Sequence, residues 1–233
     1  MVEFLGTAFL VGAVVGSGIM AERLSGGNVA LALLANTLAT GAVLVALISA
    51  LEPISGAHFN PVVSLTQAIE GRLSARQTLA YMPAQLSGGL AGTLAAHAMF
   101  GLPLLSPSHH ARTGPAQWLS EFIATFGLIL VIYGCSRFRA GAVPLAVGAY
   151  ITAAYWFTAS TSFANPAVTL ARSLSNTFAG IRPADAAPFI AAQFAGGLAA
   201  TFLLRWLVPD LPASPAAVVL PGAGTKAEAT ETS

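Results

Sequence analysis

Asn60-Pro61-Val62-Val63 and Asn165-Pro166-Ala167-Val168 are near-copies of one short motif, and each lies in a gap between long apolar segments. Asn is a preferred N-cap and Pro is favoured at the first helical position, so each copy predicts the start of a helix. One such start in a loop would carry little weight. Two of them, in matching places of an almost uncharged chain, predict a two-fold pore in a membrane protein.

The composition is typical of a helical membrane protein. Of the 233 residues, 55% are hydrophobic and only 8% are charged, which favours a polytopic protein with the lipid bilayer as its partner. Ten basic residues against nine acidic ones leave no basic surface for a phosphate backbone, so no nucleic-acid partner is expected. The single Cys135 excludes an internal disulfide and a thiolate metal cluster. We expect no metal and no cofactor.

Six apolar segments reach the length of about 20 residues that spans a bilayer. Six spans put both termini on one side, and the distribution of basic residues favours the cytoplasm for that side. The N-terminal segment lacks the basic start of a cleaved signal, which favours a retained helix. Residues 209–233 are rich in Ala, Pro, Thr and Glu and predict a disordered cytoplasmic tail. The predicted spans are 3–21, 28–50, 78–100, 118–136, 141–160 and 187–207.

Two gaps between the spans, 51–71 and 161–182, are too apolar for exposed loops and too short for further pairs of spans. Each contains a Ser-rich lead-in, then Asn-Pro, then a few helical turns. We therefore predict that both gaps re-enter the membrane as half-helices, at 60–70 and at 165–176.

The repetition extends beyond the Asn-Pro motifs. EFLGTAFL at 3–10 is echoed by EFIATFGL at 121–128, and AQLSGGLA at 84–91 by AQFAGGLA at 192–199. Because each copy holds an odd number of spans, the second enters the membrane from the opposite side. The predicted fold is an all-α membrane protein with six transmembrane helices, two re-entrant half-helices and an inverted three-helix repeat. Its parts are a first repeat (1–100), an extracellular connecting loop (101–117) and a second repeat (118–208).

An inverted repeat makes the two half-helices meet from opposite faces. Asn60 and Asn165 would then lie near the midplane, with the positive ends of both helix dipoles in one narrow space. Such a passage repels cations and protons, while the amides offer donors to the oxygen of a neutral solute. The arrangement predicts a pore for uncharged molecules.

On these motifs the chain resembles the major intrinsic protein family of aquaporins and aquaglyceroporins, over residues 3–207. The resemblance implies a homotetramer with one pore per subunit. It also implies that Asn60, Pro61 and Val62 belong to the cytoplasmic re-entrant loop, with Val62 where the family usually has Ala, and that Asn165, Pro166 and Ala167 belong to the extracellular one. Glu3 and Glu121 match the family's buried glutamates, which accept backbone N–H bonds from these loops. The alternative is that the two glutamates are interfacial and solvated.

The chain departs from the family after the second motif, where most members have an arginine and this sequence has Val168. The family's spacing implies Thr40, Ala153 and Ser162 as the other walls of the outer constriction, with Ala154 as an alternative to Ala153. These small side chains predict a wide, weakly polar selectivity filter that admits polyols or metalloid hydroxides.

Two further side chains are candidates for the pathway. Arg172 lies four residues after Val168, about 6 Å further outward on the same helix face. It either replaces the missing cation, or it snorkels to the outer interface or holds neighbouring loop carbonyls, and we prefer the second interpretation. His58 precedes Asn60 by two residues and is expected in the cytoplasmic vestibule, where its protonation is a hypothetical gate.

Residues 165–181 resemble bacterial members found beside arsenic-detoxification genes, which implies arsenite or methylated arsenicals as candidate solutes. The predicted function is a passive channel for small uncharged solutes, namely glycerol-like polyols, these arsenicals and water, in the inner membrane of a bacterium. The alternatives are a water-selective aquaporin, an alternating-access transporter and a structural membrane protein. An enzyme is disfavoured because no nucleophile with a base and no paired carboxylates are found.

Overall fold

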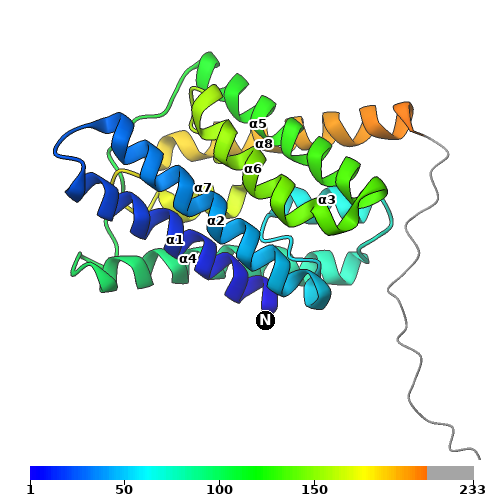
Figure 1. Cartoon of the computed structure of the whole chain (residues 1–233), viewed down its shortest axis with the longest axis horizontal. Coiled ribbons are helices and arrows are strands. Elements are labelled where there is room, and N and C mark those ends of the chain that lie inside the picture. Colours follow the sequence, from blue (N-terminus) through cyan, green and yellow to red (C-terminus); the bar gives the residue numbers. More distant parts are fainter. Residues whose placement is uncertain (209–233) are drawn as a thin grey trace, which may run out of the picture.

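The order of the helices follows the predicted repeat. The computed structural model describes residues 1–208, so the tail predicted at 209–233 lies outside the described part. All the elements of regular secondary structure in the described chain are helices, and the all-α fold class is confirmed (Figure 1). Its elements are α1 (Val2–Leu24), α2 (Val29–Ser55), α3 (Pro61–Ile69), α4 (Ala75–Met99), α5 (Pro115–Phe138), the 3-10 helix η1 (Ala140–Ala142), α6 (Val143–Phe157), α7 (Pro166–Arg172) and α8 (Pro183–Leu207).

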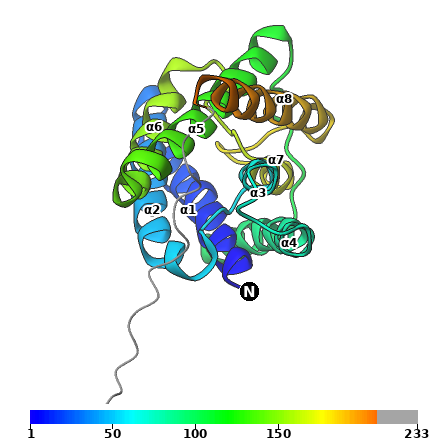
Figure 2. The same cartoon turned by 90° about the vertical axis from the view of Figure 1, so that its right-hand side faces the viewer.

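Both half-helices are shorter than the sequence indicated. Helix α3 ends at Ile69, and α7 ends at Arg172 instead of residue 176. After Arg172 the chain turns, because Ser173, Leu174 and Ser175 donate to carbonyls three or four residues back and the helix does not continue. Figure 2 shows α3 in front of α7, and the two half-helices lie between α4 and α8.

Five helical segments in the described chain are long and apolar enough to cross a membrane: α1, α2, α5, η1 with α6, and α8. Helix α4 matches them in length, with 25 residues, but it is less apolar. The reason lies on its inner face. Gln85 donates to Glu3 and Ser64, Thr93 donates to Ala171 O, and His97 bonds Ser175. The third predicted span, 78–100, therefore carries polar groups that bind the re-entrant segments.

Glycines allow two helices within each repeat to pack closely. The pairs are α1 with α4 in the first repeat and the equivalent α5 with α8 in the second. A Cβ added at Gly88 would lie 2.3 Å from Phe4 O, and one added at Gly196 would lie 2.2 Å from Phe122 O. Small residues at these crossings let the backbones approach within the bilayer.

Gly196→Ala is expected to lower the thermal stability of the protein. The new methyl group would meet backbone of α5, which cannot move aside as a flexible side chain would, and overpacking of this kind costs about 1–3 kcal/mol. The measurement is the unfolding temperature of the purified protein in detergent. Gly134→Ala is the matched control, because a Cβ at Gly134 in α5 would meet nothing within 4 Å. Equal unfolding temperatures for both variants would contradict the close approach.

Candidate functional site

The two Asn-Pro motifs start the half-helices and also tie the repeats together. Asn60 Oδ1 accepts from Val62 N at 2.9 Å, and Asn165 Oδ1 accepts from Ala167 N at 3.0 Å. Each amide nitrogen reaches across to the other repeat: Asn60 Nδ2 donates to Ala164 O at 2.7 Å, and Asn165 Nδ2 donates to Phe59 O at 2.8 Å. An amide nitrogen carries two protons, so each Asn keeps one proton beyond this cross-bond.

Two buried carboxylates hold the lead-in segments. Glu3 is 2% exposed and accepts from His58 N at 3.1 Å and from Phe59 N at 2.7 Å. Glu121 is 0% exposed and accepts from Phe163 N at 2.9 Å and from Ala164 N at 2.8 Å. The interfacial, solvated alternative does not hold, because neither side chain reaches solvent.

A glutamine completes each carboxylate site. Gln85 Nε2 donates to Glu3 Oε2 at 2.8 Å, and Gln193 Nε2 donates to Glu121 Oε2 at 2.6 Å. The equivalence follows from the repeated AQxxGGLA sequence in α4 and α8.

The lead-in segments need such support because their backbone is strained. Ala57, Phe59, Thr161, Ser162 and Ala164 all have φ between 49° and 60°, a left-handed conformation that side chains other than glycine rarely adopt. Carboxylate bonds to the amides of Phe59 and Ala164 offset part of that cost. They also fix the carbonyl groups between them.

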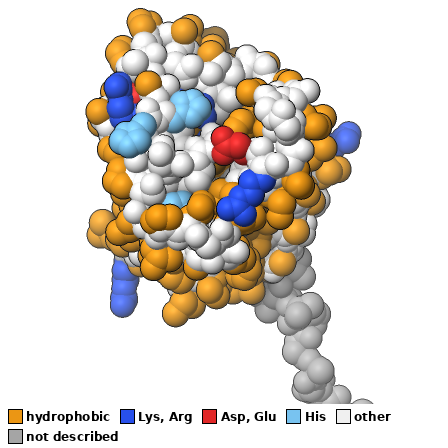
Figure 3. Space-filling model, turned by 90° about the vertical axis from the view of Figure 1, so that its left-hand side faces the viewer, with side chains coloured by type: hydrophobic (Ala, Val, Ile, Leu, Met, Phe, Trp, Pro, Cys, Tyr) orange, Lys and Arg blue, Asp and Glu red, His pale blue; other side chains and the backbone are white. Residues whose placement is uncertain are grey.

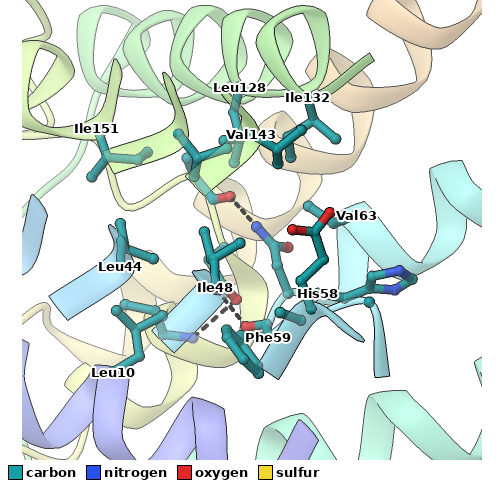
Figure 4. Close-up of a pocket in the computed structure, with 18 of the residues that line it drawn as sticks. Leu10, Leu44, Ile48, His58, Phe59, Val63, Leu128, Ile132, Val143 and Ile151 are labelled. Atoms are coloured by element: carbon teal, nitrogen blue, oxygen red, sulfur yellow. Dashed lines mark hydrogen bonds between the residues drawn. The ribbon is translucent and has the colours of Figure 1, made fainter. Parts of the chain in front are cut away.

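A cavity of about 590 Å³ runs past both motifs, and Asn60 and Asn165 are in its wall. Figure 4 shows apolar side chains from several helices turned toward this space, with His58 to one side. Helix α6 contributes one face, since its lining residues follow a spacing of four. Those residues are Val143, Val147, Ile151 and Tyr155.

The same spacing corrects the predicted filter. Ala153 is exposed on the other side of α6, about 200° around the helix from Tyr155, and it is not in the cavity wall. The alternative, Ala154, is buried but does not line the cavity either. Tyr155 lines the cavity instead, and its hydroxyl lies 3.4 Å from Thr40 Oγ1. The side chain that α6 places beside Thr40 is therefore aromatic, whereas the sequence predicted a small one.

The other predicted walls lie together at this end of the cavity. Thr40, Ser162 and Val168 all line it. Ser162 Oγ is buried and has no hydrogen-bond partner among residues 1–208. This part of the cavity wall therefore presents one hydroxyl without a partner among the described residues, a hydroxyl pair formed by Thr40 and Tyr155, and the methyl groups of Val168.

Arg172 is buried within the protein, at 1% exposure, so the prediction that it snorkels to the interface is wrong. Its Nε donates to Ala179 O, as expected for an arginine that holds a loop carbonyl. Its guanidinium carbon lies 3.4 Å from the centre of the Phe163 ring. The ring gives the cation a partner that does not require water.

Arg172 also separates two spaces. It lines the main cavity and a second, outer cavity of about 160 Å³, whose wall includes Asn36, His110, Arg112 and Thr161.

Figure 3 views the molecule from the end where the α1–α2 connection lies, and histidine, arginine and acidic side chains gather on that face. No group of three His, Cys, Asp or Glu side chains in the described chain is arranged to hold a metal ion.

A comparison with protein families agrees with this arrangement of the two motifs. The model of the family described as major intrinsic protein matches residues 1–164 and 136–231. The chain belongs to the major intrinsic protein family. The resemblance stated from the motifs is thereby confirmed, and the chain is an integral membrane protein.

Several members of the major intrinsic protein family are similar over most of the chain. Aquaglyceroporin AqpS of Rhizobium meliloti (strain 1021) is 60% identical over 213 residues, which cover 91% of this chain and 90% of that protein. Aquaporin Z of Brucella melitensis is 31% identical, covering 64% of this chain and 71% of that protein. The solved structure of the aquaglyceroporin from Plasmodium falciparum has a TM-score of 0.62 at 21% identity, covering 89% of this chain and 95% of that one, and it shows the fold.

Some residues at the site of this major intrinsic protein escaped the sequence prediction. Phe163 and Arg112 were not singled out, although the Phe163 ring contacts the guanidinium groups of both Arg112 and Arg172. The Arg112 guanidinium donates to Gly180 O at 2.9 Å and to Ser160 O at 3.1 Å, so it holds the segment that precedes the second motif. Of these features, only the four-residue spacing along α6 that leads to Tyr155 can be read from the sequence.

His58 lines the main cavity, and its place in a cytoplasmic vestibule stays a prediction. Its Nδ1 is 3.1 Å from Ser64 Oγ, and Tyr81 meets its ring edge-on at 5.5 Å. Its role as a proton-controlled gate stays a prediction.

Proposed function

We propose that the chain is a passive channel for small uncharged solutes, with glycerol-like polyols as its main class. The observation that carries the proposal is the main cavity, which passes both Asn60 and Asn165 between apolar walls. A solute crossing it finds amide protons on one side and hydrocarbon on the other. Such a surface suits a molecule that carries hydroxyl groups on a carbon backbone.

The charges in the cavity wall favour a channel over a coupled transporter. Glu52 and Arg72 line the end on the α3 side, and Arg172 lines the outer end. Between these ends the described lining holds no carboxylate. It is apolar or carries amides and hydroxyls, together with the imidazole of His58. Ion coupling in a membrane transporter usually needs an ionisable group near the binding site at the midplane.

We extend the proposal to the selectivity filter, with Thr40, Tyr155, Ser162 and Val168 as its walls and Arg172 at its outer edge. The free hydroxyl of Ser162 and the small side chain of Val168 support passage of polyols and of uncharged metalloid hydroxides such as arsenite or methylated arsenicals. The name of the AqpS relative, an aquaglyceroporin from a bacterium, also supports this solute class. By resemblance we further propose a homotetramer in the bacterial inner membrane, with both termini cytoplasmic.

The aromatic wall and the buried cation favour a second candidate, a water-selective channel. Tyr155 and Arg172 are larger and more polar than the walls predicted from the sequence. They would restrict the constriction if Arg172 points its guanidinium across it.

Stopped-flow light scattering on proteoliposomes separates the two candidates. We expect wild-type vesicles to shrink after a glycerol jump and then to reswell quickly as glycerol enters, and to take up uncharged arsenite. Empty liposomes are the control for leakage. Rapid shrinking with no faster reswelling than in empty liposomes would favour the water-selective candidate and overturn the polyol proposal.

A further inference from the structure

The outer cavity contains more positive charge than a path for neutral solutes requires. Arg112 and Arg172 both line it, and they are 9% and 1% exposed. Removing two cations from water is costly unless each has a partner of opposite charge. The partners of these two side chains therefore need to be accounted for.

Neither guanidinium forms an ion pair with a carboxylate of the described residues. Within residues 1–208 the ion pairs are Arg137 with Glu70, Arg205 with Glu70, and Arg182 with Asp185. The side-chain bonds of Arg112 go to Gly180 O, Ser160 O and Thr161 Oγ1, and those of Arg172 go to Ala179 O and to the hydroxyl of Tyr155. Neutral oxygens satisfy some of the donors but supply no negative charge.

Two acidic side chains lie in this region. The charge of Glu121 acts on both guanidinium groups, but its hydrogen bonds are accepted from Phe163 N, Ala164 N and Gln193. Asp185 accepts from Arg182 and from the backbone N–H of Arg112. Nη1 of Arg172 is buried and has no hydrogen-bond partner in the described chain. One donor in this region thus awaits an acceptor that the described chain does not supply.

Both cations are held in place by the same ring. Phe163 lies 3.4 Å from the guanidinium carbon of Arg172 and 5.1 Å from that of Arg112. Burial and the neighbouring charge of Arg172 lower the pKa of Arg112 to about 9, which still leaves it protonated at neutral pH. Burial and the two arginines lower the pKa of His110, so this side chain adds no third charge there.

We propose that the outer cavity is a binding site for one small oxyanion, held between the guanidinium groups of Arg112 and Arg172. Guanidinium groups pair with oxyanions through charge-assisted, often bidentate hydrogen bonds. The volume of about 160 Å³ has room for an ion of the size of sulfate and not for a nucleotide or a lipid headgroup with its chains. His110 is exposed and lines the cavity, so an ion can enter from the outer face.

A bound oxyanion would lie next to Arg172, where the outer cavity meets the main one. It would slow the entry of neutral solutes. Only this effect on flux rests on the proposed function, because binding itself needs nothing but the cavity.

The test is isothermal titration calorimetry of sodium sulfate into the purified full-length protein, with sodium gluconate at equal ionic strength as the reference. We expect saturable binding of one sulfate per chain. Arg172→Gln removes the unpartnered donor and one charge and should weaken binding about tenfold or more. Arg182→Gln is the matched control, since Arg182 is on the same side of the protein but is paired with Asp185 and does not line the cavity. It should bind sulfate as the wild type does.

Arg172→Lys is a second variant in case the first does not fold, as judged by size-exclusion chromatography. It keeps the charge without the planar fork and should bind sulfate more weakly than the wild type but still saturably. Absence of saturable heat in the wild type, unchanged binding in Arg172→Lys, or an equal loss in Arg182→Gln would overturn the proposal. Glycerol flux with sulfate on both sides of the vesicle is expected to be several-fold slower than with gluconate. If sulfate binds but glycerol never permeates, the proposed function fails and the oxyanion site stands.

Discussion

Val168→Arg is expected to reduce glycerol flux about tenfold or more, which corresponds to a barrier only about 1.4 kcal/mol higher. Val168 lies in the wall of the main cavity at the end that also holds Thr40 and Tyr155. A longer cationic side chain there would fill space now bounded by two methyl groups, and it would place a second positive charge one helical turn from Arg172. A polyol needs a wider passage at residue 168 than a single water molecule does. Water flux should therefore fall less than glycerol flux.

The measurement is stopped-flow light scattering with glycerol and water on the same batch of proteoliposomes, normalised to the amount of inserted protein. Val168→Met is the control that adds length without charge. A large loss with Arg and a smaller loss with Met would attribute the effect to both bulk and charge. Glycerol flux that is unchanged in Val168→Arg would mean that residue 168 is not a wall of the constriction.

Glu121→Gln should destabilise the protein by roughly 2–4 kcal/mol, since buried bonds to a charged acceptor contribute about 1.5–3 kcal/mol and an unpaired buried group costs more. Glu121 accepts from two backbone amides and from Gln193. A glutamine offers only one oxygen, and its amide nitrogen would face another donor. The left-handed backbone at Ser162 and Ala164 would then lose the bonds that hold it.

The unfolding temperature in detergent measures this loss, and flux assays on the surviving protein should show slower solute passage. Glu22→Gln is the control, because Glu22 is exposed on α1 and its replacement removes the same charge from a solvated position. If Glu121→Gln unfolds at the wild-type temperature, the carboxylate does not brace the second loop.

Much of the fold could be predicted because the chain repeats itself. The copies at Glu3 and Glu121 and at the two Asn-Pro motifs give the number of helices, their order and the inverted arrangement. A helix start depends on local residues, and therefore Asn60 and Asn165 were identified without tertiary information. The sequence already shows Gln85 as a polar residue within α4. The reason for it, its hydrogen bonds to other segments, is seen only in the structure.

The walls of the filter were harder to predict. Counting residues back from Asn165 led to Ala153, but α6 ends at Phe157, and the following lead-in has an irregular backbone that residue counting cannot follow. The burial of Arg172 was equally hidden. It depends on Phe163 and on Ala179 O, and a sequence does not reveal such contacts across loops.

The exchanged amide bonds of Asn60 and Asn165 bear on whether one repeat could stand alone. Each repeat completes the hydrogen bonding of the other, since each asparagine amide donates to a lead-in carbonyl of the opposite repeat. A single three-helix repeat would leave its own asparagine amide and the lead-in carbonyl unmatched. It would be complete only beside a second copy inserted in the opposite orientation.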